Sequence, residues 1–68
     1  MTFLGQKILE QRKEKGWTQK KLAAEIGTTE DSIYSWEKGR AEPSIDFIIK
    51  LAKIFDVTTD YLFGLSDF

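Results

Sequence analysis

The sequence predicts a single all-α domain built from five short helices. Three observations support this prediction: apolar residues recur three or four positions apart, a Ser or Thr precedes most of these stretches, and a glycine follows several of them. Signals for β-strands are absent. Because a chain of 68 residues can bury only one small core, we expect one domain over residues 1–68. The expected helices are 3–15, 18–26, 29–38, 44–56 and 58–63.

The first two helices are predicted from an apolar stripe and from residues that start and end helices. Leu4 and Ile8 are four positions apart, and Gly16 can adopt the left-handed conformation that terminates the first helix. Thr18 is placed to cap the second helix through its side-chain oxygen, and Gly27 follows its last apolar residue. A short turn at Gly27 therefore separates the second helix from the third.

The remaining helices are predicted by the same kinds of signal. Ile33 and Trp36 are three apart and point inward from the third helix, which ends near Lys38 before Gly39. Residues suited to cap the third, fourth and fifth helices are Thr28 or Thr29, Ser44 and Thr58.

The fourth helix has more apolar residues than one core can use. Its polar residues fall in one narrow sector, and apolar residues occupy the remaining arc of about 220°. The residues expected in the core are Ile45, Ile48, Ala52 and Phe55. A second stripe is then expected at Phe47, Leu51 and Ile54. Either the fifth helix, the tail or another subunit must cover that stripe.

Composition and charge disfavour an enzyme. The chain has no His, no Cys and no phosphate-binding glycine motif, and its acidic and hydroxyl side chains form no catalytic or metal-binding pattern, so we expect no catalytic residue, metal or cofactor. The longest apolar run, residues 47–49, is far shorter than the roughly 20 residues of a membrane span, and no signal pattern begins the chain. We therefore expect a cytoplasmic protein.

Net charge is −1, but the charges are unevenly distributed. Residues 1–40 contain eight basic and six acidic side chains, whereas residues 41–68 contain two basic and five acidic ones. The positive charge is therefore concentrated in the first three predicted helices.

In the segment from Gln19 to Trp36, helix packing explains the residue type at each apolar position. Ala23 is small where two helices would cross, and Gly27 permits a tight left-handed turn between them. The side chains expected to form a wedge between the helices are Leu22, Ile26, Ile33 and Trp36.

This set resembles the lambda-repressor-like Cro/CI-type (XRE) family of helix-turn-helix DNA-binding domains. The resemblance extends from about Leu4 to Leu62. It rests on the following residues: Gly16-Trp17-Thr18-Gln19, Leu22-Ala23, Gly27, Ile33, Glu37-Lys38-Gly39, Pro43-Ser44, Leu51-Ala52 and Val57.

The resemblance implies that the third helix lies in the major groove of double-stranded DNA. The side chains that would face base edges are Thr29, Glu30, Asp31, Ser32 and Ser35. Family members usually have Gln, Arg, Ser or Asn there, so Glu30 and Asp31 depart from the pattern. These acids either stabilise the start of the helix through its dipole, by about 0.3 to 1 kcal/mol, or accept a hydrogen bond from a cytosine amino group.

Other polar residues are candidates for phosphate contacts. Lys20 and Lys21 lie in the first turn of the second helix, where the dipole disfavours cations, so they either approach DNA phosphates or are simply solvated. The resemblance adds phosphate contacts at Thr18, Gln19, Lys38, the Gly39 amide and Arg40. Tyr34 points outward from the third helix and is expected to touch either a phosphate or a thymine methyl group.

The resemblance further implies a salt bridge and a dimer. Arg12 and Glu37 are expected to form a semi-buried ion pair that joins the first and third helices. Family members commonly dimerise through their C-terminal region and read palindromic operators. The corresponding dimer residues would be Phe47, Ile54, Tyr61, Phe63, Leu65 and Phe68.

The function implied by these features is a sequence-specific transcriptional regulator, with repression expected ahead of activation. A controller of a restriction-modification locus or an antitoxin would have the same features. The alternative is a protein-interaction module that uses the same fold and its acidic third helix. The chain is either a whole protein or the N-terminal domain of a longer regulator.

Overall fold

The computed structural model describes residues 2–67, and this part of the chain contains five α-helices and no strand, as predicted. The helices are α1 (Thr2–Glu14), α2 (Gln19–Ile26), α3 (Glu30–Glu37), α4 (Ile45–Phe55) and α5 (Thr59–Leu62). At most helix ends, the predicted bound differs from the observed one by a single residue. The main reason is that the predicted ranges include the capping residues. None of the described helices is both long and apolar enough to span a membrane.

Four helices begin at a Ser or Thr that the sequence marks as a cap. In each case the side-chain oxygen accepts a hydrogen bond from the backbone N–H three residues later, which satisfies a donor that has no partner inside the helix. The pairs are Thr18 with Lys21, Thr29 with Ser32, Ser44 with Phe47, and Thr58 with Tyr61. Of the two threonines available to α3, Thr29 is therefore the cap.

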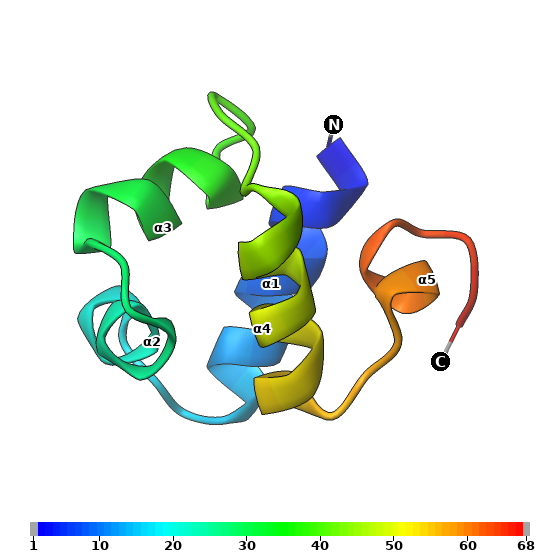
Figure 1. Ribbon diagram of the computed structural model, residues 1–68, viewed down its shortest axis with the longest axis horizontal. Coiled ribbons are helices and arrows are strands. Elements are labelled where there is room, and N and C mark those ends of the chain that lie inside the picture. The colour runs from blue at the N-terminus through cyan, green and yellow to red at the C-terminus, as the bar shows by residue number, and fades with distance from the viewer. Residues whose placement is uncertain (1, 68) are drawn as a thin grey trace.

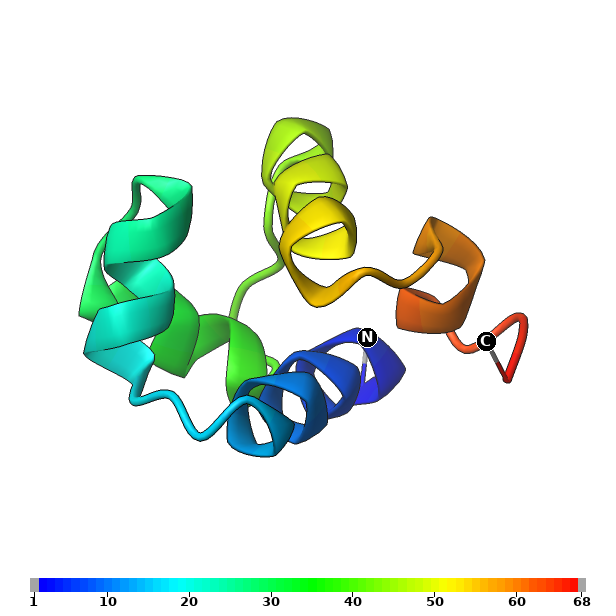
Figure 2. The same cartoon turned by 90° about the horizontal axis from the view of Figure 1, so that it is seen from below.

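Every helix contributes one face to a common core. In Figure 1, α2 and α3 lie on one side of the molecule and α5 lies on the other. Between them, α4 passes in front of α1, and Figure 2 shows these two helices as separate layers. The buried apolar side chains are Leu4, Ile8, Leu22, Ala23, Ile26, Ile33, Trp36, Ile48, Leu51, Ala52, Phe55 and Leu62. The wedge expected between α2 and α3 is thus entirely buried.

The face that α4 turns to the core is predicted correctly at Ile48, Ala52 and Phe55, which are buried, but wrongly at two other positions. Ile45, predicted for the core, is 73% exposed, whereas Leu51, predicted for the second stripe, is completely buried. The other two members of that stripe, Phe47 and Ile54, pack against the core. Phe47 contacts α3, because its ring lies 5.4 Å from the ring of Trp36.

Gly5 has a structural role that the sequence pattern does not reveal. It is buried where α1 crosses the end of α3. A Cβ atom at this position would lie 2.3 Å from the backbone oxygen of Trp36 and 3.1 Å from that of Glu37. Only glycine therefore allows the two helices to approach this closely.

We predict that Gly5→Ala destabilises the domain. Alanine favours a helix by about 1 kcal/mol over glycine, but the methyl group would overlap a backbone carbonyl, and such overpacking costs about 1 to 3 kcal/mol or more. Because the overlap at 2.3 Å is with backbone, the cost should be at the upper end of this range, and the expected net loss in the free energy of unfolding is about 2 kcal/mol, measured by urea unfolding. Lys13→Ala, exposed on the same helix, is the control and should remain near the parent. A Gly5→Ala variant as stable as the parent would contradict the close crossing.

Candidate functional site

The turn between α2 and α3 is closed by hydrogen bonds to a single carbonyl group. Gly27 has a φ of 81°, and its N–H and that of Thr28 both donate to the carbonyl oxygen of Ala23 at 2.9 Å. Thr29 then caps α3. These two hydrogen bonds end α2, and the short turn leads directly into α3.

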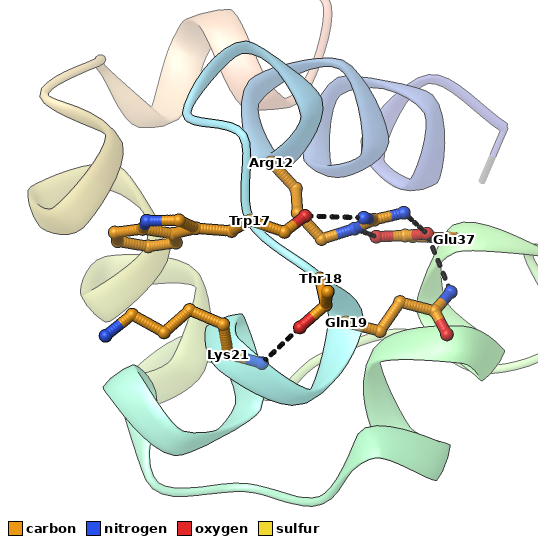
Figure 3. A network of polar contacts seen from close by, with 6 residues as sticks. All are labelled: Arg12, Trp17, Thr18, Gln19, Lys21 and Glu37. Carbon is orange, nitrogen blue, oxygen red and sulfur yellow. Dashed lines mark hydrogen bonds and ion pairs between the residues drawn. The ribbon is translucent and has the colours of Figure 1, made fainter.

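An ion pair joins α1 to the end of α3. The Nε and Nη2 atoms of Arg12 donate to the two carboxylate oxygens of Glu37 at 2.7 and 3.0 Å, and Nη1 donates to the Trp17 carbonyl at 2.8 Å (Figure 3). The side chains of Arg12 and Glu37 are only 11% and 5% exposed. The structure thus brings together the two residues that the resemblance pairs, and it adds the loop before α2 to their contact.

Gln19 joins the same network. Its Nε2 atom donates to Glu37 Oε1 at 3.0 Å, which holds the first residue of α2 against the last residue of α3 (Figure 3). Sequence reasoning assigned Gln19 to a phosphate and missed this contact. An amide nitrogen carries two hydrogens, so Gln19 can bind Glu37 and still donate to an anion.

The first turn of α3 is presented to solvent. Glu30 and Asp31 are exposed, Ser32 and Ser35 are half-buried, and no ion pair within residues 2–67 involves either acid. Among those residues, no cluster of acidic side chains is suited to a metal ion. The Thr29 hydroxyl is engaged in capping, since it accepts from the Ser32 N–H and donates to the Ser32 hydroxyl at 3.0 Å. The exposed acids therefore dominate this surface.

Basic side chains lie at the start of α2. Lys21 pairs with Glu25 at 2.9 Å, and its Nζ lies 5.8 Å from the centre of the Trp17 ring, beside which it runs in Figure 3. Lys20 is exposed and forms no ion pair with any described residue. The Thr18 oxygen accepts from the Lys21 N–H at 3.0 Å, and its hydroxyl hydrogen can still be donated to an anion. Lys20 is thus the less constrained of the two lysines.

A second group of basic side chains follows α3. Lys38 and Arg40 are exposed, and both lie near the ring of Tyr34. The Gly39 N–H, which the resemblance assigns to a phosphate, donates instead to the Trp36 carbonyl at 3.1 Å. In the chain without DNA this donor therefore serves the helix end, and its contact with a phosphate stays a prediction.

The residues predicted for a dimer surface are mostly packed within the chain. Half-buried side chains that contact the core include Phe47, Ile54, Tyr61 and Phe63. The Tyr61 hydroxyl accepts from Gln11 Nε2 at 3.0 Å. Leu65 is 77% exposed, and Phe68 lies outside the described residues. Of this predicted set, Leu65 is the residue most available to a second chain.

We predict that Glu37→Ala lowers stability sharply. The substitution leaves the buried Arg12 guanidinium without its anion and removes the acceptor of Gln19, and breaking one partner of a buried pair costs about 3 to 5 kcal/mol. For a domain of this size the unfolding temperature should fall by more than about 10 °C, measured by circular dichroism. Glu10→Ala, which removes an exposed carboxylate that contacts only Gln6 and Lys7 at the surface of α1, is the control. Equal melting temperatures for Glu37→Ala and the parent would rule out a stabilising bridge.

Comparisons with known proteins agree with this geometry. A helix-turn-helix family model matches residues 8–62. The transcriptional regulator ImmR of Bacillus subtilis is 33% identical over 64 residues, which cover 94% of this chain and 50% of the relative. SinR of Bacillus licheniformis is 34% identical over 66 residues, 96% of this chain and 60% of the relative. The chain spans about half the length of the first curated relatives it matches.

A solved structure shows the same fold. The crystal structure of the P22 c2 repressor in complex with a synthetic operator superposes with a TM-score of 0.88, covers 97% of this chain, and is 26% identical in sequence. The family model, the relatives and this structure all match across α2, the turn and α3. The chain therefore belongs to the Cro/CI-type (XRE) helix-turn-helix family and has the lambda-repressor-like fold.

Proposed function

We propose that this chain is the DNA-binding domain of a transcriptional repressor that inserts α3 into the major groove of its operator. The observation that carries the proposal is the outer face of α3, which is exposed at Glu30, Asp31 and Tyr34 and has basic residues on the neighbouring segments. Lys20 and Lys21 lie in the first turn of α2, and Lys38 and Arg40 follow the end of α3. The relatives are named as transcriptional regulators, and the P22 c2 repressor was solved with operator DNA, which supports this function.

The hydrogen bonds of Glu37 to Arg12 and Gln19, the Glu37 network, would fix the phosphate contacts and the base contacts relative to each other. Gln19 is bound to Glu37, and Glu37 is also the last residue of α3. A phosphate held at the start of α2 therefore sets the position of α3 relative to the DNA, because phosphate contacts position a protein whereas base contacts specify the sequence. The net charge of −1 does not oppose this role, since the cations are concentrated in residues 1–40.

We further propose a homodimer on a palindromic operator, acting in the cytoplasm. The support is a set of apolar side chains that the fold leaves in solvent. Ile45 and Ile49 are 73% and 43% exposed one turn apart on α4, and Leu65 after α5 is 77% exposed. Burying such residues between two copies would stabilise a twofold pair. Its half-sites would then lie about one DNA turn, roughly 34–36 Å, apart.

The phosphate contacts predict a specific change in salt dependence. Charge reversal at Lys38 and Arg40 together should weaken binding to all duplexes and flatten the slope of log K against log salt, by about 0.9 for each phosphate that the protein no longer neutralises. Fluorescence anisotropy over a salt series measures the slope. Lys53→Glu is the control, because Lys53 is exposed on the last turn of α4 and lies outside the proposed contacts. An unchanged slope in the double variant would remove these residues from the interface.

The same titration separates the two candidate functions. An electrostatic DNA binder retains even nonspecific duplex at low salt, whereas a module that binds protein through the acidic turn of α3 does not. A parent chain that binds no duplex under these conditions would overturn the DNA-binding proposal and favour the protein-binding alternative.

The role of Glu30 is tested by a randomised-duplex selection. If its carboxylate accepts from a cytosine amino group, Glu30→Gln should relax preference at one base pair, a change of about 1 to 3 kcal/mol. If it serves only the helix dipole, the selected sequences should not change and stability should fall by about 0.3 to 1 kcal/mol. Asp31→Asn is the matched variant in the same turn. The selection also shows whether half-sites occur in pairs, and single unpaired sites would contradict the homodimer.

A further inference from the structure

Tyr34 is the centre of a small cationic cluster on the outer face of α3. Its side chain is 39% exposed, although the neighbouring Ile33 and Trp36 are buried. The Nζ atom of Lys38 lies 5.7 Å from the centre of the tyrosine ring, and the Arg40 guanidinium lies 5.6 Å from it. Both distances are within the range in which a cation is attracted to an aromatic face.

The backbone brings these side chains together. Lys38 follows Tyr34 by four residues and therefore lies on the same face of the helix, and its N–H donates to the Tyr34 carbonyl at 3.0 Å. Gly39 has a φ of 73°, a left-handed conformation that turns the chain back. The Arg40 N–H then donates to the Ser35 carbonyl at 2.9 Å. With the backbone held at both positions, ring contact orders the two long side chains.

Lys38 and Arg40 have no acidic partner in the part of the chain that the structure describes. Two positive side chains near one ring repel each other, and within residues 2–67 neither Lys38 nor Arg40 forms an ion pair. Ring contact offsets part of this repulsion but does not neutralise the charges. A phosphate of the DNA backbone would supply the missing negative charge, and both cations would act on the same short stretch of that backbone.

We infer that Tyr34 is a positioning residue that orders Lys38 and Arg40 for contact with the DNA backbone and does not read a base. This inference rests on the proposed DNA binding and deepens it. Ordering a long, flexible side chain opposes binding, so a protein that holds it in place beforehand binds more tightly. Of the two contacts expected for Tyr34, phosphate or thymine methyl, the geometry thus favours an indirect role at the phosphates.

Two substitutions test the role of the ring. Tyr34→Leu removes the aromatic face and should weaken binding about 5- to 20-fold, by the same factor for every duplex, since two long side chains are no longer ordered. Tyr34→Phe retains the ring and should bind within about twofold of the parent. Anisotropy measures the affinities, and a randomised-duplex selection compares base preference. A changed base preference in Tyr34→Leu, or an unchanged affinity, would overturn the inference.

A double-mutant cycle distinguishes positioning from general destabilisation. In a Lys38→Met, Arg40→Met background, Tyr34→Leu should have no further effect on affinity, because the side chains that it orders are absent. An effect as large as in the parent would overturn the inference and assign Tyr34 a separate role. Thermal unfolding of each variant shows whether loss of folded protein contributes.

A measurement without DNA keeps this inference separate from the proposed function. In the free protein, the ring should shift the NMR signals of the Lys38 ε-protons and the Arg40 δ-protons upfield; Tyr34→Leu should abolish the shifts and Tyr34→Phe should preserve them. Absence of the shifts in the parent would overturn the positioning role even if the chain binds DNA. If the shifts are present but the parent binds no duplex at low salt, the DNA-binding proposal fails and the phosphate role fails with it.

Discussion

The carboxylate of Glu37 is the point on which the arrangement of the helices depends. Its two oxygens accept from Arg12 on α1 and from Gln19 at the start of α2, and Glu37 itself ends α3. Arg12 also binds the Trp17 carbonyl, so the loop before α2 belongs to the same unit (Figure 3). Three helices are thus joined by directional hydrogen bonds in addition to apolar packing. Removing one member of such a largely buried network is costly, because it leaves a charge without its partner.

The residues that hold the helices together are different from most of those proposed to contact DNA. The packing between α2 and α3 and the Glu37 network hold the reading helix, whereas Glu30 and Asp31 at its start are exposed and contribute nothing to the core. Glu30 and Asp31 can therefore differ from the usual residues of the family without disturbing the fold. Tyr34 lies between the two groups, because it is on the outer face of α3 and contacts two cations rather than the core.

The parts of the fold that follow from local chemistry could be predicted from the sequence. A cap such as Thr29 acts on an N–H three residues away, and Gly27 ends α2 through its own backbone conformation. The orientation of α4 could be predicted only in part: Ile48, Ala52 and Phe55 are buried as expected, but Ile45 and Leu51 are not placed as expected, because apolar residues surround most of that helix. The structural role of Gly5 could not be predicted from the sequence pattern either, since it arises only where α1 crosses α3.

For the candidate site, the sequence by itself determined the family pattern, the flanking cations and the acidic first turn of α3, because these depend only on residue type and spacing. The tertiary structure decided which groups meet. Gln19 reaches Glu37 across 18 positions and Arg12 reaches it across 25, and the Phe47 ring of α4 lies against the Trp36 ring of α3. Contacts of this kind depend on the angles between helices, which result from packing of the whole core and are not encoded in any local window of sequence.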